Sequence, residues 1–333
     1  MKILLDELNF VFIAYNMAQK QLKDNAIASG RISSGEPFIL KEEDIPFLYH
    51  VLFNKINHLF KTYGKVIICH EGRGSTDWRR NIFPEYKRNR DAGKAEDSYR
   101  IIKSTFPIVE EVFNYYPTKQ IKVDGCEADD CLFALALHFA KQGEEVLVIS
   151  SDGDLVQIMN HVDGVQIYNP VKRVFLEKDP DVVMRKAIVG DVSDHIPGLY
   201  RIGPKTFEKM LLDKALFSEK MKGDNREIFE RFKKIVDLSV FPKEKHEEII
   251  KQYEEKPWND FNVGLVENFY FENKLPDHLA RWGKESSDIL EKLVENGDAS
   301  NTIFSIKINE PSSSFVDESD EGKAMNDILN EFF

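Results

Sequence analysis

The sequence is poor in cysteine, in long apolar runs and in positive charge. Its 333 residues include three cysteines, Cys69, Cys126 and Cys131, an odd and sparse set that forms no disulfide framework and fits a reducing compartment. No apolar run reaches membrane-spanning length, and Asp6 and Glu7 interrupt any signal-peptide core near the N-terminus. We therefore expect a cytoplasmic monomer without a membrane partner.

The net charge of −12 would argue against a nucleic-acid partner if it were spread evenly along the chain, but it is not. Residues 72–104 carry nine Lys and Arg against five Asp and Glu, a local charge of +4, with Trp78, Phe83, Tyr86 and Tyr99 interleaved. Basic groups beside aromatic rings suit single-stranded nucleic acid, which offers phosphates and stackable bases. A solvated, salt-bridged pair of helices would have the same composition, so the pattern leaves both interpretations open.

What is present is the composition of a soluble globular protein, with 42% hydrophobic and 31% charged residues. Short apolar strands are expected at residues 3–5, 65–69 and 145–150, with further strands at 120–123 and 166–168. Helical patterns lie between them, at about 9–22, at 45–63 and after residue 127. This alternation predicts an α/β fold with a mostly parallel central sheet and helices on both faces. Residues 213–298 are expected to be helical.

Carboxylates gather at the ends of the expected strands. Asp6, Glu71, Asp152 and Asp154 each follow the carboxyl end of a strand, where open α/β sheets build their sites. Glu127, Asp129 and Asp130 open a helix nearby. Acidic residues also favour the first turn of a helix, and Asp152-Gly153 also fits a simple turn. Clustered carboxylates repel one another unless a cation lies among them, which points to Mg²⁺ or Mn²⁺.

A glycine-bracketed turn at residues 190–203 precedes another expected helix. Gly203 followed by Pro204 is a helix-start signal, and the helix extends through Leu212. The free backbone N–H groups of such a turn, with Lys205 and Thr206 after it, are suited to gripping a phosphate.

Taken together, five stretches resemble the 5′ nuclease (flap endonuclease) superfamily. They are most similar to the bacteriophage 5′–3′ exonucleases, a group that includes the T-even-type phage ribonuclease H. The stretches are Trp78-Arg79-Arg80 with Pro84-Glu85-Tyr86-Lys87-Arg88-Asn89-Arg90, Glu127-Ala128-Asp129-Asp130, Ile149-Ser150-Ser151-Asp152-Gly153-Asp154, Gly190-Asp191-Val192-Ser193-Asp194 and Ile202-Gly203-Pro204-Lys205-Thr206. Each alone is weak, but all five stand in the family's order and spacing. The resemblance covers roughly residues 2 to 212.

The resemblance implies a PIN-like 5′ nuclease core at 1–189 with a helical arch at 72–104, and a helix–hairpin–helix element and helical region at 190–300. It implies two-metal, in-line hydrolysis at 5′ ends or flaps of DNA and RNA–DNA hybrids, leaving a 5′-phosphate. The residues that would serve the first Mg²⁺ are Asp6, Glu71, Glu127, Asp129 and Asp130; those for the second are Asp152, Asp154, Asp191 and Asp194. We predict that catalysis depends on Asp130, Asp152, Arg79 and Lys87, the last by neutralising charge on the scissile phosphate. The predicted nucleic-acid contacts are Arg79, Arg80, Tyr86, Lys87, Arg88, Arg90, Arg201, Gly203, Lys205 and Thr206.

Two departures from the family pattern bear on the ions. The family usually has Asp where Glu71 stands, and its longer side chain can shift the first metal or bind it through water. The family often holds a monovalent cation at the hairpin, but Arg201 stands where glycine is common and can supply the positive charge itself. A PIN-type ribonuclease shares the carboxylate chemistry but lacks the arch and hairpin stretches. The other alternative is a flap-binding or junction-binding replication module without catalysis.

The C-terminal segment 309–333 begins with an acidic, serine-rich stretch that we expect to be disordered. After it, Met325, Ile328, Leu329 and Phe332 form one apolar face of a short helix, which Phe333 extends. Ten residues are too few to be stably helical alone. The segment either folds back onto its own domain or inserts Ile328, Leu329, Phe332 and Phe333 into a groove on a partner. The end is similar to the aromatic-terminated tails with which phage replication proteins engage a sliding clamp, so we predict a clamp as that partner.

Overall fold

The computed structural model describes residues 1–90 and 97–297 of the 333. Residues 1–297 form one compact unit, so the predicted division between a nuclease core at 1–189 and a region at 190–300 stays a prediction. The middle of the predicted arch, 91–96, and the predicted partner-binding residues Ile328, Leu329, Phe332 and Phe333 lie outside the described residues.

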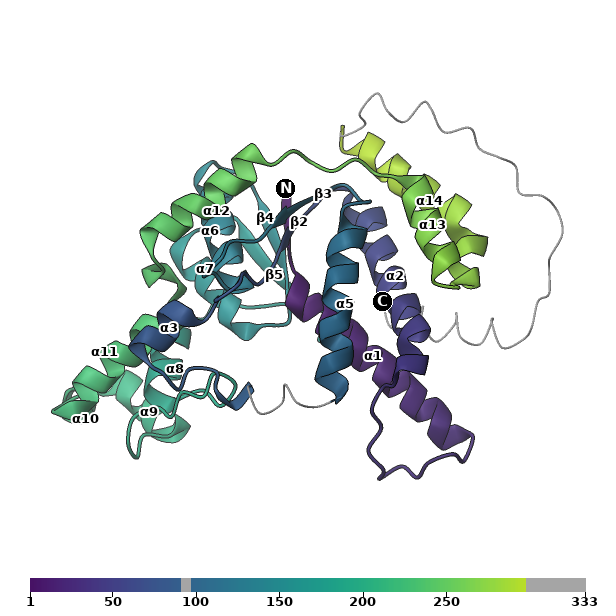
Figure 1. Ribbon diagram of the computed structural model, residues 1–333. Helices are drawn as coiled ribbons and strands as arrows, with labels where there is room; N and C mark the ends of the chain where they lie inside the picture. The colour runs from purple at the N-terminus through teal and green to yellow at the C-terminus, as the bar shows by residue number, and fades with distance from the viewer. Residues whose placement is uncertain (91–96, 298–333) are drawn as a thin grey trace. The chain divides into compact units, whose positions relative to one another are not determined.

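A six-stranded sheet forms the centre of this unit, in the order β3-β2-β1-β4-β5-β6 (Figure 1). The strands are β1 (Lys2–Asp6), β2 (Val66–Cys69), β3 (Thr118–Ile121), β4 (Val146–Ile149), β5 (Val165–Asn169) and β6 (Val174–Phe175). All neighbouring pairs are parallel except β5 and β6, which are antiparallel. The prediction of a mostly parallel sheet is confirmed. Because β1, β2 and β4 are parallel neighbours, their carboxyl ends meet at one edge.

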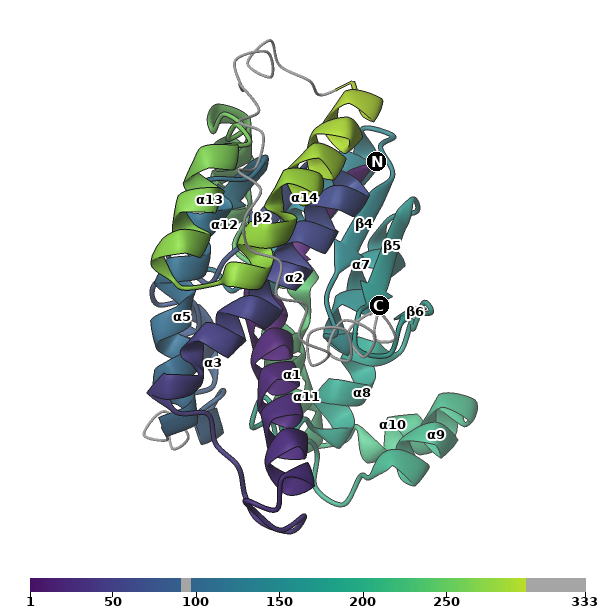
Figure 2. The same ribbon diagram turned by 90° about the vertical axis from the view of Figure 1, so that its right-hand side faces the viewer.

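Helices cover both faces of the sheet, as predicted, because successive residues of each strand point to opposite sides. Ile3 and Leu5 face one hydrophobic core, and Leu4 faces another. The first core is covered by α1 (Glu7–Ala28), α2 (Ile45–Tyr63), α5 (Asp97–Phe113), α13 (Val263–Glu272) and α14 (Pro276–Glu295). The second is covered by α6 (Ala128–Lys141), α7 (Gln157–His161) and α12 (Lys243–Glu255). Figure 1 shows these two layers, and Figure 2 shows α14 beside α2.

A third hydrophobic core lies beyond the sheet, among α8 (Val182–Val189), α9 (Pro204–Leu212) and α11 (Asp224–Val236). The short helices α3 (Asp77–Ile82) and α10 (Lys214–Lys220) and the 3₁₀ turns η1 (Glu42–Asp44), η2 (Gly153–Val156) and η3 (Leu238–Val240) complete the described elements. The helical character predicted for 213–298 is therefore found in α10 to α14. None of the described helices combines the length and apolarity needed to cross a membrane.

Most expected elements lie within a few residues of their predicted positions, and α2 begins and ends where the pattern placed it. The strand expected at 120–123 instead forms as Thr118–Ile121, two residues earlier, in register with Val66–Cys69. Val123 belongs to a loop that approaches Gly72 closely. A Cβ at Gly72 would lie 1.8 Å from the Val123 carbonyl oxygen, so only glycine fits directly after Glu71.

Candidate functional site

Four of the predicted carboxylates line one cavity of about 190 Å³ at the carboxyl edge of the sheet. We call Asp6, Glu71, Asp129 and Asp152 the cavity carboxylates. Asp6 ends β1 and caps α1, with its carboxylate oxygens accepting from the Asn9 amide at 3.0 Å and the Ser150 hydroxyl at 2.9 Å. Asp152 caps η2 and accepts from the Asp154 amide at 2.8 Å. Local caps therefore fix two of the four side chains before any ligand binds.

Three of the cavity carboxylates, Asp6, Glu71 and Asp129, have raised pKa values. Burial raises the pKa of Asp6 to about 6, and nearby Asp152 and Glu7 add to the shift. Burial and the charge of Glu127 raise the pKa of Glu71 to about 7. The pKa of Asp129 is raised well above its ordinary value by burial and by Asp152 and Asp6. Such shifts are those of carboxylates that lack enough cationic charge around them, and a divalent cation with oxygen ligands fits this set.

Glu127 and Asp130, at the start of α6, are occupied by protein cations. Glu127 pairs with Lys87, with Arg79 Nη1 at 2.7 Å, and accepts from the Tyr86 hydroxyl at 3.0 Å. Burial alone would raise the pKa of Glu127, but Lys87 and Arg79 lower it to about 2. Asp130 is fully buried and accepts two bonds from Arg79, at 2.6 and 2.9 Å, and one from the Glu127 amide at 2.9 Å.

Arg79 is itself 1% exposed, and its Nε donates to the Ile235 carbonyl at 3.0 Å. Tyr86 is 3% exposed. We predicted that Arg79 and Tyr86 contact nucleic acid and that Asp130 contacts a metal ion. In this arrangement all three side chains are buried and already paired with other protein groups, so they are not free to make those contacts. We infer that all three position Glu127 and the arch base, the segment 83–90.

The remaining predicted acids form a second group, Asp154, Asp191 and Asp194, whose donor oxygens lie within 4.8 Å of one another. The ammonium of Lys186, from α8, contacts all three, with Nζ 2.8 Å from Asp191 and 3.3 Å from Asp194. We call these the lysine-bridged carboxylates. Burial opposes the shift, but bonds from Lys186 and Ser193 lower the pKa of Asp191 to about 2. Burial raises the pKa of Asp154 to about 6 although Lys186 acts against it.

Glycine shapes the loop that carries Asp191 and Asp194. Gly190 has φ +96° and Gly198 has φ +71°, and a Cβ at either would lie within 2.6 Å of backbone atoms on the other side of the loop. The arch base packs on this loop. The Lys87 amide donates to the Asp194 carbonyl at 3.0 Å, and Asn89 Nδ2 donates to the Val192 carbonyl at 2.8 Å. The loop therefore connects the lysine-bridged carboxylates to the arch base.

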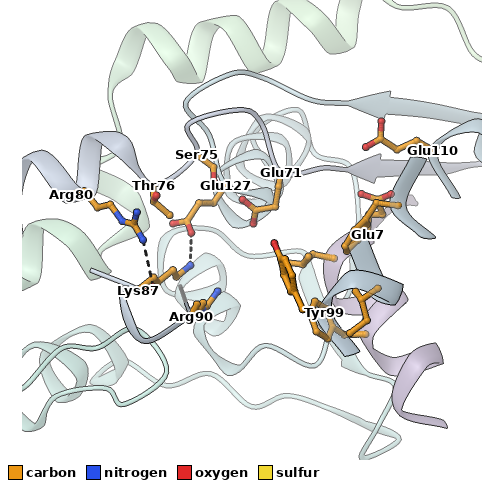
Figure 3. Close-up of a pocket in the computed structure, with 14 residues that line it drawn as sticks. Glu7, Glu71, Ser75, Thr76, Arg80, Lys87, Arg90, Tyr99, Glu110 and Glu127 are labelled. Carbon is orange, nitrogen blue, oxygen red and sulfur yellow. Dashed lines mark hydrogen bonds and ion pairs between the residues drawn. The ribbon is translucent and has the colours of Figure 1, made fainter. Parts of the chain in front are cut away.

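Lys87 and Arg90 are the arch-base cations that line the 190 Å³ cavity. Lys87 has φ +55°, an uncommon conformation for a side chain of this size, and its Nζ lies between Glu127 and, at 3.9 Å, Asp194. Arg90 lies 3.1 Å from Asp194. A larger adjoining cavity of about 780 Å³ is lined by both residues together with Arg80, Tyr99 and Phe106 (Figure 3). Among the cavity carboxylates, Glu71 lines this larger cavity too, so the cavity combines cations, aromatic groups and a carboxylate.

The other predicted contacts are Arg80, which lines the larger cavity, Arg88 and the hairpin residues. Arg80 donates to the Tyr86 carbonyl at 3.0 Å, and Arg88 is exposed with an ion pair to Glu85 at 3.1 Å. At the hairpin, Arg201 and Lys205 are exposed, Thr206 is half-buried and Gly203 caps α9. Arg201 has φ +58° and its guanidinium lies over the Tyr200 ring, 4.8 Å from the ring centroid.

Sequence reasoning missed Lys186. The signal was present, since Lys186 stands five and eight residues before Asp191 and Asp194. Only the packing of α8 shows that its ammonium turns toward them. Asp152 lines the cavity of Asp6 and Asp129, whereas Asp154 is grouped with Asp191 and Asp194. The assignment of these acids to a first and a second metal ion stays a prediction.

This fold and site define a class of protein: a resolvase-like α/β domain with acidic side chains at the carboxyl edge of its sheet. Residues 2–189 match the family model described as the 5′-3′ exonuclease, N-terminal resolvase-like domain, and the chain belongs to that family.

Relatives share this region. The chain is 32% identical over 205 residues to a 5′-3′ exonuclease of Buchnera aphidicola, covering 57% of this chain and 65% of the relative. It is 26% identical over 165 residues to ribonuclease H of Enterobacteria phage T4, covering 46% and 54%. The chain thus covers less than two thirds of the length of these relatives. The T5 D15 protein, co-crystallised with metal ions, has a similar fold, with a TM-score of 0.52 and 20% identity over 76% of this chain and 98% of that one.

Proposed function

We propose that this protein is a divalent-metal-dependent 5′ nuclease that cuts phosphodiesters at 5′ ends or flaps. The observation that carries the proposal is the set of cavity carboxylates, which come from β1, β2, α6 and the end of β4 and line one cavity beside Lys87 and Arg90. The raised pKa values of Asp6, Glu71 and Asp129 favour an ion of opposite charge. Membership of the 5′-3′ exonuclease family supports the reaction type.

Asp6, Glu71, Asp129 and Asp152 would hold one Mg²⁺ or Mn²⁺, and the lysine-bridged carboxylates would hold a second. Bound divalent ions activate water and stabilise the attacking and leaving oxygens of an in-line displacement that leaves a 5′-phosphate. The chain's own residues bind and orient the strand. Lys87 and Arg90 face the cavity and meet charge that builds on the scissile phosphate, while Tyr99 and Phe106 offer rings to unpaired bases in the larger cavity.

The substrates we propose are DNA and RNA–DNA hybrids with 5′ ends or flaps. The names of two relatives, 5′-3′ exonuclease and ribonuclease H, support both nucleic acids. Exposed Arg201 and Lys205, with the Gly203 cap of α9, would hold the duplex backbone away from the cleavage point. Arg201 would supply positive charge there in place of a monovalent cation. The sliding clamp proposed for the C-terminal segment remains a prediction from sequence.

One observation favours the alternative, a flap-binding module that does not cleave. Lys186 already occupies the space among the lysine-bridged carboxylates, where a second ion would bind. Such a protein would bind flaps equally well with and without divalent ions and leave them intact.

The test is a panel of 5′-labelled substrates: a flap, a nicked duplex, an RNA–DNA hybrid and a single strand, each with Mg²⁺ or with chelator. We expect Mg²⁺-dependent release of short 5′ products from the flap and the hybrid. Binding to the flap without cleavage under any ion condition would establish the alternative. A PIN-type ribonuclease would cut the RNA strand without needing a 5′ end.

A further inference from the structure

A second cluster of metal-binding residue types lies beside the cavity carboxylates but is separate from them. Glu7, His70 and Glu110 each place one donor atom within 4.8 Å of the other two. They come from three elements: Glu7 begins α1, His70 directly follows β2, and Glu110 lies in α5. Nothing in the proposed cleavage reaction uses them.

Two members of this cluster are deeply buried and incompletely satisfied. His70 is 1% exposed and Glu7 is 3% exposed. The His70 Nδ1 atom lies 2.6 Å from one Glu7 carboxylate oxygen. The other carboxylate oxygen of Glu7 and the Nε2 atom of His70 are buried without a hydrogen-bond partner among the described residues. Leaving the Glu7 oxygen unpaired costs about 1–3 kcal/mol, so its presence calls for a ligand. Because Nε2 lies on the opposite side of the imidazole ring from Nδ1, an ion shared with Glu7 would bind His70 through Nδ1.

The cluster is accessible from the larger cavity. Glu7 and Glu110 line the 780 Å³ cavity, and Figure 3 shows their side chains next to one another, away from Lys87 and Glu127. One oxygen of Glu110 lies 2.6 Å from Lys122 Nζ, and a carboxylate has a second oxygen to offer. An ion can therefore reach the cluster from the larger cavity, whose lining includes Glu71 but not Asp6, Asp129 or Asp152.

We propose that Glu7, His70 and Glu110 bind a divalent transition-metal ion of the Zn²⁺ type, distinct from the ions of the cleavage site. Zn²⁺ accepts imidazole nitrogen and carboxylate oxygen together, and with three protein ligands it keeps a fourth position open. Mg²⁺ prefers oxygen ligands only, so the imidazole separates this site chemically from the cavity carboxylates. The bound ion joins α1 and the end of β2 to α5, the helix that begins within the predicted arch and continues beyond it.

The test is a calorimetric titration of the full chain with ZnCl₂. Saturating Mg²⁺ is present throughout to occupy the all-oxygen sites, and metal analysis of the titrated protein then counts the bound Zn²⁺. We expect one equivalent of Zn²⁺ to bind. His70→Gln should weaken that binding by roughly 100-fold. His161→Gln, an exposed histidine on α7, and Asp152→Asn, in the cleavage site, should leave it unchanged. Anomalous diffraction at the zinc edge should place the ion between α1 and α5.

Any of three results would overturn the proposal. The first is the absence of any Zn²⁺ equivalent in the folded wild-type chain, which would leave Glu7 and His70 as a buried hydrogen-bonded pair only. The second is Zn²⁺ binding that survives His70→Gln but disappears in Asp152→Asn, which would place Zn²⁺ in the cleavage site. The third is Zn²⁺ binding that survives in both variants, which would point to the buried cysteines. If His70→Gln does not fold by circular dichroism, Glu110→Gln, on the half-buried side of α5, carries the same test.

Discussion

The cavity carboxylates and the lysine-bridged carboxylates both bring like negative charges close together, but they differ in the cations that balance those charges. The lysine-bridged carboxylates enclose an ammonium from their own chain, Lys186, which neutralises part of their charge. The cations that line the cavity of the cavity carboxylates, Lys87 and Arg90, pair with Glu127 and Asp194 instead, and the pKa values of Asp6, Glu71 and Asp129 are raised. Buried like charges need a cation, and among the described residues the lysine-bridged group holds one in contact with all three of its carboxylates. We infer that the cavity carboxylates take an external ion first.

The difference follows from where the residues come from. Lys186 is on the helix that leads directly into Asp191, so a few residues of chain bring cation and anions together. The cavity carboxylates come from four separate elements, and the cations that line their cavity, Lys87 and Arg90, belong to the arch base. Charge balance in the cavity therefore depends on how the arch base packs.

The largest effect that would test this comparison is on cleavage. Asp152→Asn keeps the side-chain volume but removes one charge from the cavity carboxylates. We expect the single-turnover rate in Mg²⁺ to fall roughly 1,000-fold, since the charge stabilisation supplied by a metal ion amounts to several kcal/mol. Flap affinity should change little because the arch base and hairpin remain. Asp163→Asn, an exposed position on the loop before β5, is the matched control. A near wild-type rate for Asp152→Asn would refute the role of the cavity.

The second effect is on stability. Lys186→Met leaves three neighbouring carboxylates without their shared cation. Because Lys186 is only 8% exposed, we expect a loss of about 3–5 kcal/mol in the free energy of unfolding in chelator. Mg²⁺ should restore part of this loss by taking the vacated position. Urea unfolding with and without Mg²⁺ measures both quantities, and Lys172→Met on the surface is the control. Equal stability of Lys186→Met and wild type in chelator would show that the bridge is unimportant.

The third effect is on pH dependence. The folded pKa of Glu71, about 7, lies above its ordinary value of 4.5, so the folded protein binds more protons than the unfolded chain between these pH values. In chelator, this group therefore makes stability fall as pH rises from about 4.5 to 7. A divalent ion binds the deprotonated form, so stabilisation by Mg²⁺ should be larger at pH 8 than at pH 5.5.

Thermal unfolding at the two pH values, with Mg²⁺ and with chelator, measures this dependence. Glu71→Gln cannot titrate and should flatten it in chelator, with Glu85→Gln on the arch base surface as the control. A stabilisation by Mg²⁺ that is the same at both pH values would contradict the raised pKa.

The smallest expected effect is on flap binding. It distinguishes the arch-base cations that line the cavity from those on the surface. Arg88 is exposed and pairs only with Glu85 among the contacts described. Arg88→Ala should weaken flap binding slightly and lower the slope of log affinity against log salt by about 0.7–0.9, as for one lost phosphate contact. Lys87→Ala should instead lower the single-turnover rate more than the affinity. Equal effects of both substitutions on rate and on salt slope would remove the distinction.

Local patterns were sufficient to predict the edge where the site lies. Asp6, Glu71 and Asp152 could be placed together from sequence because each follows an apolar strand, and parallel strands bring their carboxyl ends to one edge. Helix α2 was predicted correctly because its apolar spacing is a local signal.

Tertiary packing alone decided what each charge near that edge contacts. In the sequence, Arg79 is a basic residue of the predicted arch and suits nucleic acid. In the structure it is buried between Asp130 and the carbonyl of Ile235, a residue 156 positions away in the chain. His70 shows no local sign of its partners, and the nearness of Lys186 to Asp191 and Asp194 in the chain does not show that its ammonium turns toward them. Helix and strand periodicity predict a buried face but not which side chain from another element meets it. The residues at the sheet edge were determined by chain order, whereas the pairing of their charges was determined by three-dimensional packing.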